Sequence, residues 1–150
     1  MDFEFLEMSI ADYDEVTAFW KGQPGIGSNE ADSRENIEAY LKRNDGLSIV
    51  VREDGRTGNV IAAVLCGHDG RRGYLHHLAV APAHRKRGLG AKLVEKCLLN
   101  LRTQGVLKCN VYVWADNLDG QKFWRAIGYK DRNDLLVMQQ DTLKETETAG

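Results

Sequence analysis

A basic cluster directly before two glycines is the part of this sequence whose chemistry can be read most directly. Residues 84–87 (HRKR) lead into residues 88–90 (GLG), where a helix-like pattern of apolar residues begins. The first N–H groups of a helix have no intrahelical acceptor and carry positive partial charge, so they can bind an anion. Glycines let a phosphate approach the backbone, and arginines match its charge with paired donors. The pattern predicts an anion site.

Other anion-binding patterns fit less well. The Gly-Lys-Ser/Thr ending of a P-loop is absent, and Leu93 occupies the third glycine position of a dinucleotide fingerprint. A net charge of −2, from 20 basic and 22 acidic residues, argues against a general binder of nucleic acids or membrane surfaces. A solvated basic face at a glycine-rich helix start is the structural alternative. If the cluster is not such a solvated face, its positive charges bind a ligand at this one place in the protein.

Two histidines precede this motif in residues 74–80, an apolar run that is typical of a strand. Imidazole titrates close to neutral pH, so such a ring can act as a general base. Because side chains alternate along a strand, we expect Tyr74 and His76 on one face and His77 and Ala79 on the other. Packing of both histidines as partly buried rings is the structural alternative.

The elements around these residues indicate a mixed α/β fold. At 150 residues the chain has the usual size of one domain, and we expect residues 1–150 to form a single one. Periodicity and turn residues predict strands at 3–8, 47–51, 60–65, 74–80, 106–114 and 135–138, and helices starting near 12, 33, 88 and 121.

The ordered features after the fourth strand resemble a known cofactor signature. Leu-Ala-Val at 78–80, Pro82, and Arg-x-x-Gly-x-Gly-Ala at 85–91 are similar to the acetyl-CoA motif of the GNAT superfamily of N-acetyltransferases. Asn117 and residues 123–129 (FWRAIGY) resemble its second cofactor segment, and the layout is similar to ribosomal-protein and amino-acid acetyltransferases. The resemblance implies the GNAT fold, with a mixed central sheet of six to seven strands and about four helices.

The same resemblance implies acetyl-CoA as co-substrate and no metal. The backbone of Leu78 and Val80 would bond the pantetheine arm, which Asn117 would also contact. The helix that carries Phe123 and Trp124 would line the thiol end. The N–H groups and side chains around the pyrophosphate would be those of Arg85, Lys86, Arg87, Gly88, Leu89, Gly90 and Ala91.

The implied reaction is direct transfer of acetyl to a primary amine. His76 occupies a position where the family often presents Glu or His, so we expect His76 to be the general base, with Tyr74 beside it. Many members place a Tyr near the departing sulfur, and Trp124 stands at the corresponding position. An indole N–H can donate a hydrogen bond but supplies no proton near neutral pH. Trp124 would stabilise the thiolate, or the thiolate leaves unprotonated; Tyr112 and Tyr129 are alternatives.

The sequence leaves the acceptor open between a peptide or protein amine and a small-molecule amine. Residues 20–32 contain three glycines and are expected to form a loop that controls specificity. The alternative function is a catalytically silent acetyl-CoA-binding or interaction module, which is prompted by Trp124 in place of the family's Tyr.

Cysteine usage and the N-terminus bear on location. Cys66, Cys97 and Cys109 show no metal-ligand spacing, and an odd number of cysteines is typical of free thiols in a reducing compartment. The acidic N-terminus is unlike a signal peptide, and no apolar run reaches membrane-spanning length. We expect a cytoplasmic protein with neither membrane nor nucleic acid as partner. Since many family members form dimers, a homodimer is a further expectation.

Overall fold

The computed structural model describes residues 3–27 and 29–143 of the chain. It contains two compact units, Met1–Asn117 and Leu118–Gly150, called here the first and second units. The first unit holds a five-stranded sheet in the order β1-β2-β3-β4-β5, antiparallel throughout except that β4 and β5 run parallel. The strands are β1 Leu6–Glu7, β2 Ile49–Asp54, β3 Thr57–His68, β4 Gly73–Val80 and β5 Cys109–Val111.

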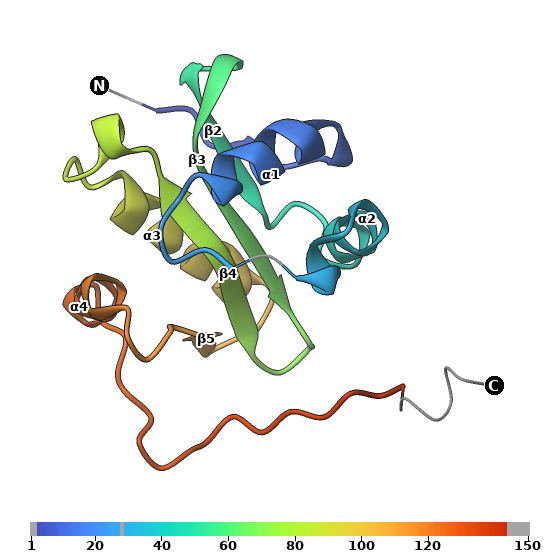
Figure 1. Cartoon of the computed structure of the whole chain (residues 1–150), viewed down its shortest axis with the longest axis vertical. Helices are drawn as coiled ribbons and strands as arrows, with labels where there is room; N and C mark the ends of the chain where they lie inside the picture. The colour runs from blue at the N-terminus through green and yellow to red at the C-terminus, as the bar shows by residue number, and fades with distance from the viewer. Residues whose placement is uncertain (1–2, 28, 144–150) are drawn as a thin grey trace. The chain divides into compact units, whose positions relative to one another are not determined.

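Three helices of the first unit cover the two faces of this sheet (Figure 1). Helices α1 and α2 lie on one face, and α3 lies on the other. None of the described helices is both long and apolar enough to cross a membrane. The helices are α1 Tyr13–Lys21, α2 Arg34–Arg43, α3 Leu89–Thr103 and, in the second unit, α4 Leu118–Ala126; short 3-10 turns are η1 Ile10–Asp12, η2 Glu30–Asp32 and η3 Pro82–His84.

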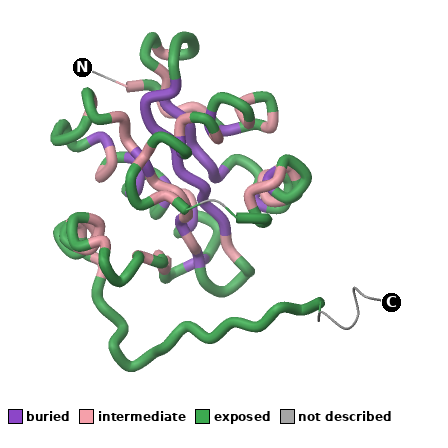
Figure 2. The backbone as a smooth tube through the Cα atoms, in the orientation of Figure 1, coloured by how far each residue is buried: buried purple, intermediate pink, exposed green. Residues whose placement is uncertain are grey.

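The core consists of two apolar layers that share β3. Figure 2 shows the buried residues concentrated along the central strands, because β3 is covered by helices on both faces. Val16, Trp20 and Ile37 of the first two helices form one layer with the sheet. The other layer includes Cys66 and Cys97, and a hydrogen bond between these thiols together with burial raises the pKa of Cys66. All three cysteines are free thiols.

The sheet is smaller than the sequence predicts. Five strands are found among the described residues instead of six to seven, and β5 is shorter than the predicted strand at 106–114. The predicted strand at 135–138 is wrong, because this segment has no regular structure. A strand needs a neighbour to satisfy its N–H and C=O groups, and α4 is the only regular element in the described part of the second unit.

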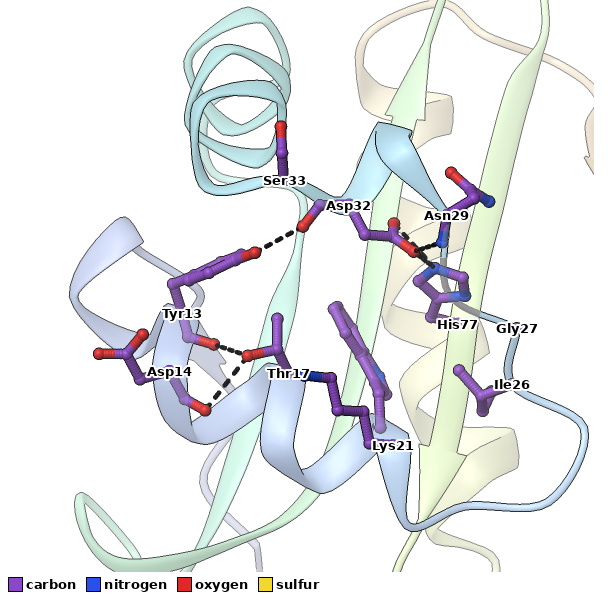
Figure 3. A pocket seen from close by; sticks show the side chains of 11 residues that line it. Tyr13, Asp14, Thr17, Lys21, Ile26, Gly27, Asn29, Asp32, Ser33 and His77 are labelled. Atoms are coloured by element: carbon purple, nitrogen blue, oxygen red, sulfur yellow. Dashed lines mark hydrogen bonds and ion pairs between the residues drawn. The ribbon is translucent and has the colours of Figure 1, made fainter.

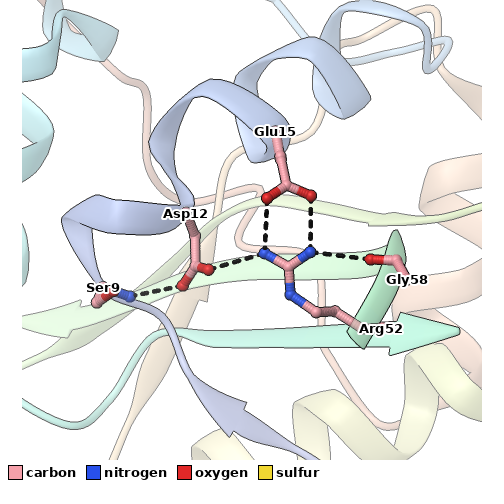
Figure 4. A network of polar contacts seen from close by, with 5 residues as sticks. All are labelled: Ser9, Asp12, Glu15, Arg52 and Gly58. Atoms are coloured by element: carbon pink, nitrogen blue, oxygen red, sulfur yellow. Dashed lines mark hydrogen bonds and ion pairs between the residues drawn. The ribbon is translucent and has the colours of Figure 1, made fainter. Parts of the chain in front are cut away.

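Arg52 of β2 fastens the first helix to the sheet (Figure 4). Its Nη2 donates to Oδ1 of Asp12 at 2.9 Å, and its Nη1 donates to Oε2 of Glu15 at 2.7 Å and to the Gly58 carbonyl at 3.0 Å. Asp12 also accepts from the Ser9 N–H at 2.9 Å. The Arg52 side chain is 11% exposed and that of Asp12 is 17% exposed, so the carboxylate is largely shielded from water.

Removing this guanidinium should destabilise the first unit. We expect Arg52→Ala to lower the free energy of unfolding by about 1 to 3 kcal/mol, because the shielded Asp12 carboxylate loses its charged donor. The bond from Arg52 also holds the pKa of Glu15 below its ordinary value. The difference in the free energy of unfolding between wild type and variant should therefore shrink as the pH falls through the range in which carboxylates become protonated. Denaturant unfolding at several pH values measures both effects.

The matched control is Arg56→Ala, which removes an exposed arginine paired with Glu4. Exposed ion pairs add little to stability, so this variant should unfold almost as the wild type does. Equal losses in the two variants would show that the Arg52 contacts do not stabilise the fold.

Candidate active site

A bulge in the middle of β4 organises the site. Ala79 pairs with Ala63 and His76 pairs with Leu65, so residues 77–78 together lie opposite a single residue of β3. An extra residue on one strand bends that strand and shifts its side-chain alternation. The predicted alternation is therefore wrong, because Ala79 lies on the same side as His76, in the layer formed with α1 and α2.

After the bulge, β4 has an open edge. β5 pairs with β4 only at residues 73–75, and no described strand continues the pairing beyond them. The Ala81 N–H donates to the Ile61 carbonyl on the β3 side at 2.7 Å. Because the N–H and C=O groups of successive residues in a strand point to opposite sides, those of Leu78 and Val80 face away from β3. An extended ligand can bond this edge as a strand would.

The loop between β4 and α3 has the backbone geometry of an anion site. Lys86 and Gly88 both have a left-handed φ, 64° and 77°. A Cβ built on Gly88 would meet no atom within 4 Å, so the space in front of this backbone is open. The Lys92 N–H donates to the Gly88 carbonyl at 3.0 Å, which leaves the N–H groups of residues 89–91 without helical acceptors. These features fit a pyrophosphate group.

Arg85 bonds its own chain instead of extending into that space. Its Nε donates to the Val80 carbonyl at 2.8 Å, and its Nη2 donates to Oε1 of Gln23 at 2.9 Å. Gln23 belongs to the loop between α1 and α2, so one guanidinium joins this loop to the end of β4. Lys86 and Arg87 are exposed beside the anion-binding backbone.

A pocket of about 420 Å³ lies on the α1 and α2 side of β4 (Figure 3). Its wall combines aromatic, hydroxyl and carboxylate side chains with one imidazole. The lining residues are Tyr13, Asp14, Thr17, Trp20, Lys21, Ile26, Gly27, Asn29, Asp32, Ser33 and His77.

The imidazole of this pocket belongs to His77 and is paired with a carboxylate. Nε2 of His77 lies 3.0 Å from both Oδ1 and Oδ2 of Asp32. The ring also packs on the indole of Trp20, with 5.0 Å between ring centroids. A group capable of proton transfer thus lies in the pocket wall between an aromatic ring and a carboxylate.

His76, the base predicted from the sequence, lies in an aromatic cluster and is not among the residues that line this pocket. The ring of Tyr74 stacks on it at 6.3 Å, and the rings of Tyr40 and Tyr112 lie at 6.4 and 6.2 Å. Burial, followed by the nearby charge of His77, lowers the pKa of His76. The ring is therefore neutral at physiological pH.

Asn117 lies beside the loop between α1 and α2. A Cβ on Gly25 would lie 3.1 Å from Nδ2 of Asn117, and one on Gly27 would lie 3.5 Å from the ring of Trp114. The loop from α1 therefore passes closely over the segment that follows β5. Glycine is favoured at position 25 for two reasons: a Cβ would lie too close to Asn117, and the φ of 82° is left-handed.

Phe123 and Trp124 lie on α4 in the second unit. Their rings make an edge-to-face contact at 5.1 Å, and Trp124 makes a similar contact with Tyr129 at 4.8 Å. The Tyr129 N–H donates to the Trp124 carbonyl at 2.9 Å, which closes the end of the helix. The part of Phe123 and Trp124 in cofactor binding stays a prediction.

The contact between Asp32 and His77 was not predicted from the sequence. Ser33 is the N-cap of α2, as the sequence suggests, since its side chain accepts from the Asn36 N–H at 3.2 Å. In the sequence, Asp32 is equally compatible with a place in that helix cap. It lies 45 residues from His77, so the sequence does not indicate that the two are in contact. No spacing rule predicts such a contact, although a polar pair of histidines in an apolar strand is a signal that could have drawn attention to both rings.

The lowered pKa of His76 should make stability depend on pH. The folded protein binds a proton at His76 less readily than the unfolded chain, so His76 should destabilise the fold as the pH falls through its ordinary pKa near 6.5. We expect His76→Gln to lose less stability than the wild type between about pH 7.5 and about pH 5.5. Thermal or denaturant unfolding at the two pH values measures this, and parallel losses in both proteins would contradict it.

The sequence matches a known family over most of its length. Residues 13–129 match the acetyltransferase (GNAT) family, a span that includes parts of both units. An acetyltransferase of Sodalis glossinidius is 25% identical over 136 residues, which cover 91% of this chain and 93% of the relative. One of Photorhabdus laumondii is 28% identical over 131 residues, with 85% and 86% covered.

Solved structures share the fold. Ard1 from Thermoplasma volcanium has a TM-score of 0.72 at 18% identity, with 85% of this chain and 82% of that chain covered. The PaiA N-acetyltransferase of Thermoplasma acidophilum, in complex with coenzyme A, has a TM-score of 0.71 at 20% identity, with 87% and 91% covered. AAC(6')-Iy, in complex with the bisubstrate analogue CoA-S-monomethyl-acetylneamine, has a TM-score of 0.71 at 17% identity, with 94% and 99% covered. The chain belongs to the GNAT family of acetyltransferases and takes its acetyl group from acetyl-CoA.

Proposed function

We propose that this protein transfers acetyl from acetyl-CoA to a primary amine that binds in the pocket beside α1, η2 and β4. The observation that carries the proposal is the adjacency of His77 and Leu78 on one strand. His77 lines the pocket, and the N–H groups of Leu78 and Val80 face the open edge, where Arg85 bonds the Val80 carbonyl. Residues in a strand rise by about 3.3 Å each, so donor and acceptor would meet within about 10 Å.

The donor side supports binding of acetyl-CoA along β4 and the start of α3. The open edge at Leu78 and Val80 suits the amide groups of pantetheine, and the left-handed backbone at Gly88 with its open space suits the pyrophosphate. Lys86 and Arg87 add positive charge there. The N–H groups of Leu89, Gly90 and Ala91 lack helical acceptors and would bond the pyrophosphate as well. The remaining contacts are proposed on the family resemblance alone, namely those of Arg85, Asn117, Phe123 and Trp124.

The acceptor side suits a cationic amine. Asp14 and Asp32 contribute carboxylates to the lining, and Trp20 and Tyr13 contribute aromatic faces that can pack on a cation. PaiA is named as an N-acetyltransferase, and the AAC(6')-Iy structure holds an analogue that contains acetylneamine. These names support an amine nitrogen as acceptor and leave its size open.

The reaction needs a proton acceptor, because most primary amines are protonated at neutral pH and an ammonium has no lone pair with which to attack the thioester. His76 is one candidate, since its lowered pKa keeps it neutral and Tyr74 stacks on it. His77 is the other, since its ring lines the pocket. The departing thiol has an ordinary pKa of about 8.5, so it can leave as a thiolate, which the Trp124 indole would stabilise as a hydrogen-bond donor.

A panel of amines tests the proposal directly. Purified protein with acetyl-CoA should release free CoA and form one acetylated product per CoA with at least one class among amino acids, polyamines, aminoglycosides and peptides. Thiol release and product mass measure the two sides of the reaction. Tight binding of acetyl-CoA without transfer to any amine would favour a catalytically silent module, and absence of binding would contradict the donor site.

A pair of glycine variants tests the anion site. Gly88→Val fills the open space and strains a φ of 77°, so we expect the affinity for acetyl-CoA to fall at least about tenfold, about 1.4 kcal/mol. Gly105→Val is the matched control, because Gly105 follows the other end of α3 with a φ of 83° and equally open space. Calorimetric titration should show weakened binding in the first variant alone. Equal affinities in the two variants would remove Gly88 from the site.

A further inference from the structure

We propose that His77, held by Asp32, is the group that accepts the proton of the acceptor amine, and that Asp32 is its positioning residue. This inference rests on the proposed function, because it assigns a role inside the same pocket. It differs from the assignment predicted from the sequence, which favoured the neighbouring His76.

The contact between the two side chains determines which ring nitrogen is available. A carboxylate can only accept, so Nε2 of His77, which lies 3.0 Å from both carboxylate oxygens, carries the proton. The lone pair of the neutral ring is then on Nδ1. Figure 3 shows the edge of the ring with Nε2 turned toward Asp32, and the second nitrogen lies on the far side of the ring. Among the described residues, Nδ1 of His77 makes no hydrogen bond, so its lone pair can take a proton.

Asp32 is itself held in place by its neighbours. The Tyr13 hydroxyl donates to the Asp32 carbonyl at 2.6 Å, and the Asn29 N–H donates to its Oδ2 at 3.3 Å. The side chains of His77 and Asp32 are only 18% and 14% exposed, so little water competes for the pair. A carboxylate in this position stabilises the imidazolium that forms when His77 takes up a proton.

The backbone at His77 supports a functional role. Its φ of 57° lies in the left-handed region, which is unfavourable for a residue other than glycine. Such conformations persist where the surroundings determine them, and they concentrate at functional sites. Here the strained backbone turns the imidazole toward the indole of Trp20, 5.0 Å away between centroids, and toward Asp32.

In the proposed step the acceptor nitrogen loses two protons and a C–N bond replaces the C–S bond. Nδ1 of His77 takes one proton from the ammonium of the acceptor. The lone pair that is released forms the C–N bond to the acetyl carbon, and the electrons of the C–S bond move to sulfur. The nitrogen then loses a second proton, which the departing thiolate takes up directly or through water, and His77 returns its proton to solvent.

Kinetics of two variants test the assignment. Asn is among the residues that tolerate a left-handed φ, so His77→Asn should fold while lacking a base. We expect kcat to fall about a hundredfold or more, with acetyl-CoA affinity within about twofold of wild type. Asp32→Asn keeps an oxygen for the Asn29 N–H and removes the charge, so kcat should fall at least about tenfold while KM for the amine changes less.

A matched control separates positioning from folding. Glu35→Gln removes an exposed carboxylate of α2 that is not among the pocket residues. It should leave both kcat and KM unchanged, whereas Asp32→Asn should lower kcat with a smaller change in KM.

Two results would overturn the proposal. One is a His77→Asn variant that keeps near wild-type kcat while His76→Gln loses it, which would return the role to His76. The other result comes from an experiment without an acceptor amine, so it tests the proposal even if no amine in the panel is acetylated. Nitrogen-15 NMR of the histidine rings in the wild-type protein should show His77 protonated at Nε2, and Asp32→Asn should disturb this signal. Protonation at Nδ1 instead would exclude the proposed geometry.

Discussion

The bulge in β4 is the constraint on which the rest of the site depends. One extra residue places His76 and Ala79 on the same side of the sheet, and the pairing of β4 with β5 ends at Leu75, before the bulge. In a regular strand the edge of Leu78 and Val80 could be closed by its neighbour, and the ring of His77 would face the apolar layer beneath α3. That layer offers thiols and leucines, so an imidazole there would lose its hydrogen bonds.

The helices on the two faces of the sheet contribute different parts of the site around β4. The start of α3 supplies the backbone proposed to bind the pyrophosphate, and α1 with the turn before α2 supplies much of the pocket wall. Arg52 matters for the pocket wall because it bonds α1 through Glu15. The same helix carries Trp20, which packs on His77. The sheet therefore does more than fill the core, because β4 both lines the pocket through His77 and leads to the start of α3.

Local patterns predicted much of this molecule. The helix starts at Ser33 and Gly88 follow from capping chemistry and glycine conformation, and the structure has them there. Asp32 and His77 could not be paired from the sequence, because their contact depends on a loop between two helices and on a bulge that leaves no local signature. The last predicted strand failed for a related reason. Residues 135–138 have the composition of a strand, but a strand exists only where another strand bonds it.

The left-handed backbone at His77 limits how this enzyme can change over evolution. Glycine, asparagine and aspartate are the residues that adopt such a φ most readily, and none of them carries an imidazole. In the role proposed for His77, a replacement at this position would have to satisfy both the geometry of the chain and the chemistry of proton transfer, and these two demands select different residues. New acceptor preferences are more accessible in the segment between α1 and α2, where Ile26 and Asn29 contribute to the wall without such backbone demands. The fold thus separates a part that is hard to vary from a part that is free to diversify.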